Sequence, residues 1–203
     1  MVLWDKRVFV LTYLSDNQTL PEQCRAAAHT PIAEPAWLVR ELRSVIAGEA
    51  GAVAIYRGIL SVARDPEIRS FALAHLETER KHLELVSSLL ARRDHSVLMV
   101  FWRLAGFFTG LLPGLLGAAP VYFTINCVET FVDLHYKSQI DRLLEEAIYP
   151  EICACLEACR QDEVKHRDEA RACLSEMPGP FERIWCRAVA SGSNATVAAA
   201  RRI

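Results

Sequence analysis

The sequence has little net charge, no framework of paired cysteines and few prolines inside its long apolar segments. Lys and Arg number 23 and Asp and Glu 25, so the net charge is −2 and leaves no electrostatic footprint for nucleic acid. The seven cysteines are odd in number and scattered, and no secretory signal precedes them, so we expect no disulfide framework and an intracellular, reducing location. The first residues also lack the Arg- and Ser-rich amphipathic pattern of a transit peptide.

Apolar residues are what the sequence has in excess. They make up 52% of its 203 residues, above the roughly 45–50% of ordinary soluble domains. Such a surplus needs a large core, a partner or a membrane. The length fits one domain with a sizeable core, which we place at residues 35–203. Residues 1–34, punctuated by prolines, are treated as an N-terminal extension to which we assign no structure.

From Trp37 onward, apolar residues recur at spacings of three and four, the period of helices that bury one face. The pattern predicts helices over residues 37–63, 66–92, 120–146, 150–175 and 181–189. Pro66 suits the first position of the second helix. Four long helices with two short loops and one long crossover predict an all-α, ferritin-like four-helix bundle with an extra C-terminal helix.

The crossover at residues 97–123 is almost entirely apolar. It is longer than the about 20 residues that span a bilayer, but Arg103, Pro113 and four glycines interrupt it. We therefore favour an interfacial element, or two short helices lying on the membrane face, through which a lipid reaches the bundle. A buried crossover and a true transmembrane insertion are the alternatives.

Two Glu-x-x-His motifs occur in the second and fourth helices, and each has a lysine directly before its histidine. Residues three apart share a helix face, so the carboxylate and the imidazole of each motif can bind one metal ion together. The other two helices each carry a glutamate followed seven residues later by a tyrosine. This duplicated helix pair predicts the four-glutamate, two-histidine site of di-metal bundles. The six predicted ligands are Glu49, Glu79, His82, Glu129, Glu163 and His166.

The surroundings of Glu49 and Glu129 strengthen the metal prediction. Both lie in otherwise apolar or small-residue segments, so their carboxylates should be buried, where a charge without a partner is costly. Metal ions would supply that partner, and salt-bridged structural glutamates are the alternative. Asp162, next to Glu163, can accept a hydrogen bond from the free N–H of a ligating histidine; a solvated surface aspartate is the alternative. His75 has no partner motif, and we expect it at the surface or at a helix cap.

These motifs resemble the demethoxyubiquinone hydroxylase family, ferritin-like di-iron monooxygenases of ubiquinone biosynthesis. The resemblance covers about residues 42–173 and rests on the Ala-Gly-Glu-Ala-Gly-Ala run at residues 47–52, both Glu-x-x-His motifs, Val128-Glu129 and His135-Tyr136. It implies two iron ions on the six ligands, with Glu79 and Glu163 as bridging candidates and manganese as the less favoured metal. It also implies that His135 and Tyr136 lie near the quinone and take part in catalysis.

The resemblance implies the reaction as well, an O₂-dependent hydroxylation of the ring of a membrane-embedded isoprenoid quinone, with electrons from an external donor such as NADH. In a bacterium the protein would be peripheral on the cytoplasmic face of the inner membrane. The protein partners that the resemblance suggests are a second copy of the chain or a lipid-presenting protein. Val45, Thr130 and Leu134 depart from the family pattern. These departures leave two alternative functions open: another di-metal oxidase or oxygenase, and a quinone- or lipid-binding helical protein without catalysis.

Overall fold

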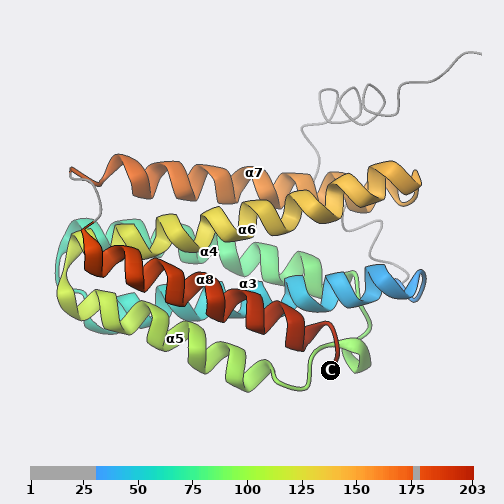
Figure 1. Cartoon of the computed structure of the whole chain (residues 1–203), viewed down its shortest axis with the longest axis horizontal. Helices are drawn as coiled ribbons and strands as arrows, with labels where there is room; N and C mark the ends of the chain where they lie inside the picture. Colours follow the sequence, from blue (N-terminus) through green and yellow to red (C-terminus); the bar gives the residue numbers. More distant parts are fainter. Residues whose placement is uncertain (1–30, 176–178) are drawn as a thin grey trace, which may run out of the picture.

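The computed structural model of the chain describes residues 31–175 and 179–203, so the predicted N-terminal extension lies almost wholly outside the described residues. Within the described ranges the chain forms six α-helices, one short 3₁₀ helix and no strand, which confirms the all-α prediction. The helices, drawn in Figure 1, are α3 (Ala36–Val62), α4 (Pro66–Ser88), α5 (Met99–Leu116), α6 (Ala118–Glu146), α7 (Pro150–Ala172) and α8 (Pro180–Ala200).

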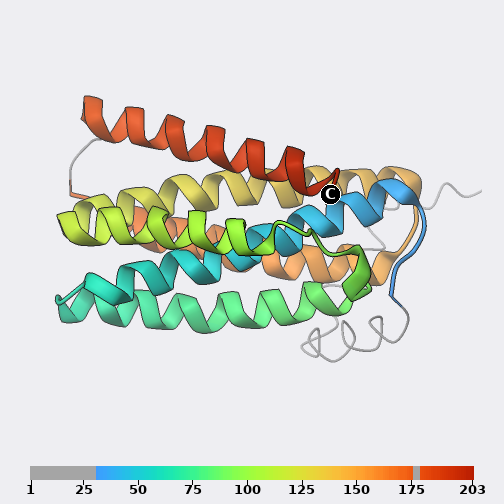
Figure 2. The same cartoon turned by 90° about the horizontal axis from the view of Figure 1, so that it is seen from below.

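Four of these helices make the bundle. Short connections join α3 to α4 and α6 to α7, so each pair runs antiparallel, and the pairs pack together around a common core. Figure 1 shows α5 along the side of the bundle away from α7, and Figure 2 shows α8 along the side away from α4. The arrangement agrees with the predicted ferritin-like bundle, long crossover and extra C-terminal helix.

The apolar core consists of two clusters, one toward each end of the bundle. One cluster includes Leu42, Ile46, Leu143 and Leu156, and the other includes Ile59, Ile68, Val121 and Ile125. Along every bundle helix, the predicted metal ligands fall between the residues of these two clusters. The fold therefore places a polar layer between two apolar ones.

Some helix boundaries differ from the predicted ones. The second helix begins as predicted, with Pro66 in its first turn and the carboxylate of Asp65 accepting from the Glu67 amide at 2.8 Å. It ends at Ser88 rather than at residue 92, where a 3₁₀ turn follows. The last helix runs to Ala200 instead of ending at residue 189. Its alanine-rich end favours helix despite Gly192, and the buried Val197 and Ala200 anchor it to the bundle.

Within the crossover, α5 is one helix that ends at Gly117, whose φ is 109°, and α6 begins directly after it, so the alternative of two short helices was wrong. The three glycines inside α5 do not break it; they lie on one face and allow close packing on α3. A Cβ atom at Gly106 would lie 2.3 Å from the carbonyl oxygen of Gly51, and one at Gly110 would lie 1.9 Å from that of Ile55. Only glycine permits this approach of two backbones.

The opposite face of α5 is apolar and exposed. Two described helices, α3 and α5, are long and apolar enough to cross a membrane; 67% of the apolar window of α3 is buried in the structure, but only 22% of that of α5. The alternative of a buried crossover therefore applies only to the face of α5 that carries the glycines and packs on α3. The exposed large side chains along this segment are Val97, Val100, Phe101, Leu104, Phe108, Leu112, Leu115 and Leu116. A contiguous patch of this kind is unusual on a soluble monomer and marks an interaction surface.

Candidate metal centre and adjoining cavity

The six predicted metal ligands converge in the middle of the bundle. Each of the four bundle helices contributes at least one, and every one is at most 5% exposed. The two Glu-x-x-His motifs present both their side chains inward because residues three apart lie on one helix face. The site residues are Glu49 on α3, Glu79 and His82 on α4, Glu129 on α6, and Glu163 and His166 on α7.

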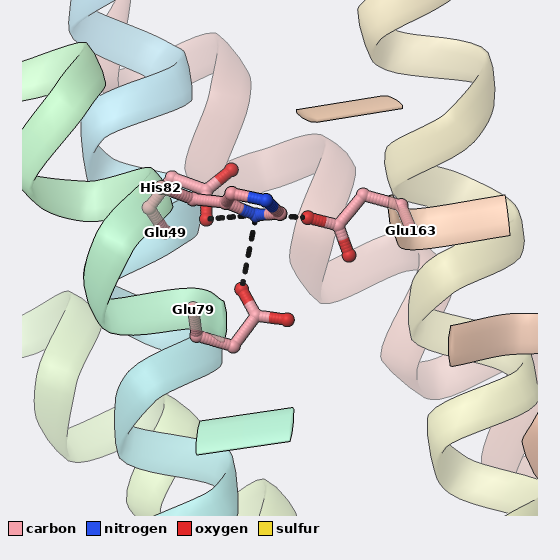
Figure 3. A group of neighbouring side chains, drawn as sticks. All are labelled: Glu49, Glu79, His82 and Glu163. Atoms are coloured by element: carbon pink, nitrogen blue, oxygen red, sulfur yellow. Dashed lines mark hydrogen bonds and ion pairs between the residues drawn. The ribbon is translucent and has the colours of Figure 1, made fainter. Parts of the chain in front are cut away.

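The six side chains form two overlapping groups. The first contains Glu49, Glu79, His82 and Glu163, whose candidate ligand atoms all lie within 4.8 Å of one another. Figure 3 shows its three carboxylates turned toward the imidazole of His82. The His82 Nδ1 atom lies 2.9 Å from Glu163 Oε1 and 3.9 Å from both Glu49 Oε2 and Glu79 Oε2.

The second group contains Glu79, Glu129, Glu163 and His166, again within 4.8 Å of one another. The His166 Nδ1 atom lies 3.1 Å from Glu79 Oε1 and 3.5 Å from Glu163 Oε2. Glu79 and Glu163 thus belong to both groups, while each group has one further glutamate and one histidine of its own. This is the pattern expected if two cations share two carboxylates.

The buried polar atoms of the site fit metal ions. Glu49 Oε2, both oxygens of Glu79, Glu129 Oε2, Glu163 Oε2 and His166 Nδ1 have no hydrogen-bond partner. An unsatisfied buried polar atom costs about 1–3 kcal/mol, and divalent cations would satisfy all of these atoms at once. Carboxylates together with imidazoles suit iron and manganese. The residues present therefore fit the predicted pair of ions.

Without a nearby positive charge, the ionised form of the buried carboxylates in this site is unfavourable. Burial, followed by repulsion from neighbouring carboxylates, raises the pKa of Glu49 and Glu129 well above the usual range. Burial opposes ionisation of Glu163 too, but the neighbouring imidazoles of His166 and His82 lower its pKa to about 2. Burial likewise opposes the charge of His166, but the adjacent carboxylates of Glu163 and Glu79 raise its pKa to about 9. The centre thus holds its negative charge only where an imidazolium or a cation faces it.

Glu49 and Glu129 each belong to only one of the two groups, and each accepts a hydrogen bond from a tyrosine. The Tyr56 hydroxyl donates to Glu129 Oε1 at 3.1 Å, and the Tyr136 hydroxyl donates to Glu49 Oε1 in a short hydrogen bond. Each tyrosine therefore binds the glutamate of the opposite helix, not the one seven residues before it. Both are fully buried, and burial raises the pKa of both hydroxyls.

Asp162 supports the centre from the surface. Its side chain is 51% exposed, and its Oδ2 atom lies 3.1 Å from the Nε2 atom of His82, which confirms the predicted hydrogen bond to a candidate ligand histidine from a residue that also faces solvent. The partner is the histidine of α4, not His166 on its own helix. This bond leaves the Nδ1 atom of His82 facing the carboxylates, an arrangement typical of histidines that bind metal.

The prediction for His75 was wrong. The residue is 3% exposed and lies inside the bundle. Its Nδ1 atom is 3.1 Å from the Tyr56 hydroxyl and its Nε2 atom is 2.8 Å from Glu169 Oε2. The spacing to Glu79 was the available signal, because residues four apart share a helix face.

An apolar cavity of about 320 Å³ adjoins the centre between α3, α5, α6 and α8. Its wall includes the four glutamates of the centre, aromatic side chains such as Trp102 and Phe131, and both His135 and Tyr136. The Nε2 atom of His135 lies 3.0 Å from Ser44 Oγ and 2.9 Å from Gln139 Nε2. Burial, with a smaller contribution from Arg201, lowers the pKa of His135 to about 4.

Helix α8 closes the cavity and is covalently tied to α6. A disulfide joins Cys127 on α6 to Cys186 on α8, with 5.8 Å between their Cα atoms. We expected no disulfide framework and did not predict this bridge, because 59 residues separate the two cysteines and only the packing of α8 on α6 brings them together.

The fold and the site define a helical-bundle protein with a buried layer of four carboxylates and two imidazoles that could hold metal ions, open to an apolar cavity. The model of the family described as ubiquinone biosynthesis protein COQ7 matches residues 36–200 of the chain. The chain belongs to this family, which confirms the resemblance drawn from the motifs.

Curated relatives of the chain carry hydroxylase names. It is 36% identical over 138 residues to the 3-demethoxyubiquinol 3-hydroxylase of Rhodospirillum rubrum, a match that covers 66% of this chain and 64% of the relative. It is 31% identical over 160 residues to the human NADPH-dependent 3-demethoxyubiquinone 3-hydroxylase, mitochondrial, covering 77% and 69%. The 3-demethoxyubiquinol 3-hydroxylase of Dechloromonas aromatica is 28% identical over 176 residues, covering 84% and 83%. The chain thus spans somewhat less than two thirds of the Rhodospirillum rubrum relative.

Proposed function

We propose that this protein is an O₂-dependent di-iron hydroxylase that hydroxylates the ring of a demethoxyubiquinone-type isoprenoid quinone in ubiquinone biosynthesis. The observation that carries the proposal is the pair of buried groups sharing Glu79 and Glu163 on the wall of an apolar cavity. The names of the relatives support the reaction and the substrate class.

In this proposal Glu49 and His82 would hold one ion and Glu129 and His166 the other, and Glu79 and Glu163, which belong to both groups, would serve both. Manganese is the less favoured metal. Bound iron supplies the redox chemistry that activates O₂, while the protein contributes binding, orientation and the surrounding electrostatics. Electrons come from a reduced nicotinamide nucleotide: NADH was our expectation, and NADPH is the donor in the name of the human relative.

The residues of the cavity bind and orient the ring. Its wall is mostly apolar and excludes water from the centre. His135 lines the cavity, where its imidazole could hydrogen-bond a quinone or quinol oxygen in the neutral form, because its pKa is lowered to about 4. Tyr136 keeps Glu49 in place through its short hydrogen bond. We assign catalytic roles to these two residues.

The exposed face of α5 binds a membrane surface. The glycine face of α5 packs along the core helix α3, which favours a helix lying beside the bundle over one that leaves it to cross a bilayer. Phe181 and Ile184 extend the apolar surface onto α8. A second apolar cavity of about 300 Å³ lies between α5, α6 and α8 and suits the isoprenoid tail. In a bacterium the surface would be the cytoplasmic face of the inner membrane, where a second copy or a lipid-presenting protein would dock.

The departures from the family pattern give little support to a different substrate. Thr130 and Leu134 are exposed, and of the three residues only Val45 lines the cavity. A binding protein without catalysis would not need six buried ligand side chains. Neither alternative has an observation in its favour.

Metal analysis and a product assay test the proposal. The purified full chain, reconstituted with Fe²⁺ without oxygen, should bind two ions and convert a demethoxyubiquinone-type substrate when O₂ and a reduced nicotinamide nucleotide are supplied. It should also restore ubiquinone in a hydroxylase-deficient bacterium, and Glu163→Gln should not. Absence of bound iron would refute the centre; iron binding without product in either assay would refute the substrate.

A further inference from the structure

His75 is a buried imidazole that contacts neighbouring aromatic rings and has a partner for each ring nitrogen. It lies one helical turn before Glu79 on α4. Its ring is stacked on that of His166, with centroids 4.0 Å apart and planes 16° apart, and the Phe71 ring lies against it at 4.0 Å with a tilt of 45°. The nitrogens contact the Tyr56 hydroxyl and the Glu169 carboxylate. A histidine in an apolar core is costly unless its polar atoms are paired, so these contacts are what permits it there.

The contacts of His75 lead to one half of the centre. It touches His166 directly by stacking. It reaches Glu129 through Tyr56, whose hydroxyl lies 3.1 Å from both the His75 Nδ1 atom and the Glu129 Oε1 atom. These are the two ligands that belong only to the second group. The first group is supported differently, by Tyr136 on Glu49 and by Asp162 on His82.

Glu169 anchors the ring from outside. Its side chain is 45% exposed, and it lies one turn after His166 on α7. Its Oε2 atom is 2.8 Å from His75 Nε2, and its Oε1 atom is 3.8 Å from Lys165. A hydrogen bond at Nε2 sets the orientation of the ring, and with it the position of Nδ1 against Tyr56. A chain of contacts thus runs from the surface of α7 to a ligand on α6.

We propose that His75 is a positioning residue of the centre, which orients Glu129 through Tyr56 and His166 by stacking, with Glu169 holding its ring. The role rests on the proposed metal function. Outer partners that orient ligands typically change metal affinity 10- to 100-fold when removed. Because the contacts of His75 are confined to one group, its loss should weaken one of two bound ions and spare the other.

Titration with Co²⁺ alone, in the absence of oxygen and substrate, tests this role in the full chain. Binding is followed by the visible absorption of the bound ion, which reports ligand geometry and does not depend on turnover. Wild type should show two dissociation constants. In His75→Phe, which keeps an aromatic ring but has no nitrogens, one constant should rise 10- to 100-fold with an altered spectrum, and the other should change less than threefold.

Substitutions at Glu169 keep the test informative if His75→Phe does not fold. Glu169→Ala should weaken the same ion, whereas Glu169→Gln, whose amide oxygen still accepts a hydrogen bond, should bind like wild type. Glu77→Ala is the matched control, because Glu77 is an exposed glutamate paired with Lys81 at 3.6 Å, as Glu169 is with Lys165. It should bind both ions normally.

The possible results of these titrations distinguish the proposed metal centre from the proposed positioning role of His75. If wild type binds no Co²⁺, the proposed metal centre is wrong. If wild type binds two ions and His75→Phe or Glu169→Ala binds both as tightly, or both equally more weakly, the positioning role is overturned and the centre stands. Equal weakening by Glu77→Ala and Glu169→Ala would also overturn it.

Discussion

The hydroxyl of Tyr56 on α3 lies 3.1 Å from Oε1 of Glu129 on α6. The reverse contact also exists, because Tyr136 on α6 donates to Glu49 on α3. Each half of the duplicated helix pair therefore carries a tyrosine that supports the carboxylate of the other half. Each half of the centre therefore depends on a hydrogen bond that the other half donates.

Removing one of these hydroxyls should weaken the centre. Tyr136→Phe keeps the buried ring but leaves Glu49 without its hydrogen bond, and a bond to a charged group contributes about 1.5–3 kcal/mol. We expect Fe²⁺ affinity to fall about 10- to 100-fold at one of the two ions, as measured by anaerobic titration. Tyr149→Phe is the control, since its hydroxyl donates to the Glu34 carbonyl far from the centre. Equal affinities in Tyr136→Phe and wild type would contradict the prediction.

The buried His135 should make the protein sensitive to acid. Its pKa falls from an ordinary 6.5 to about 4 on folding, so folding favours the neutral ring. A lowered histidine pKa contributes stability that is fully present above pH 6.5 and is lost as the pH falls from 6.5 toward 4. The shift corresponds to about 3 kcal/mol at most. Urea unfolding at pH 7.5 and 5 should show a smaller loss of unfolding free energy in His135→Asn than in wild type; an equal loss would contradict the assignment.

The close packing of α5 on α3 should not tolerate a methyl group. In Gly110→Ala the new Cβ would lie 1.9 Å from the Ile55 carbonyl oxygen, and such overpacking costs typically about 1–3 kcal/mol, occasionally more. Gly192→Ala is the matched control within a helix, because a Cβ there meets nothing within 4 Å. It should stabilise the helix by about 0.5–1 kcal/mol. Urea unfolding of both variants measures the difference, and a Gly110→Ala protein as stable as wild type would contradict this packing.

Charges on the exposed face of α5 should prevent membrane binding without unfolding the protein. Phe101 and Phe108 are 63% and 52% exposed, so the double change Phe101→Glu and Phe108→Glu disturbs little of the core. We expect at least a tenfold loss of co-sedimentation with phospholipid vesicles and unchanged iron content. Leu73→Glu is the control, since Leu73 is 53% exposed but lies on α4. If the double variant sediments like wild type, another surface binds the membrane.

The predictable part of the site consists of residues whose relationship is local. Glu79 with His82 and Glu163 with His166 were identified because three residues always span most of a helical turn. Glu49 and Glu129 were identified because a carboxylate in an apolar segment needs a partner. His75 was missed since its partners, Tyr56 and Glu169, lie 19 and 94 residues away. The disulfide between Cys127 and Cys186 was missed for the same reason.

In the crossover, glycine weakens the helix locally but permits close packing against a neighbouring helix. Glycines in an apolar segment predicted breaks, because glycine is a poor helix former in isolation. In the structure α3 supplies a surface against which only glycine fits, and the packing energy of the contact outweighs the weak local preference. Helix α8 was predicted too short, and its buried Val197 and Ala200 hold its last turns in place.

By itself, the sequence determined the helices, the six inward-facing candidate ligands and the surplus of apolar surface on the crossover, because helical periodicity acts within a few residues. The tertiary structure decided which tyrosine supports which glutamate, where His75 lies and how α5 and α8 enclose the cavity. Those relationships depend on the register between helices, and that register is set by packing between residues far apart in the chain.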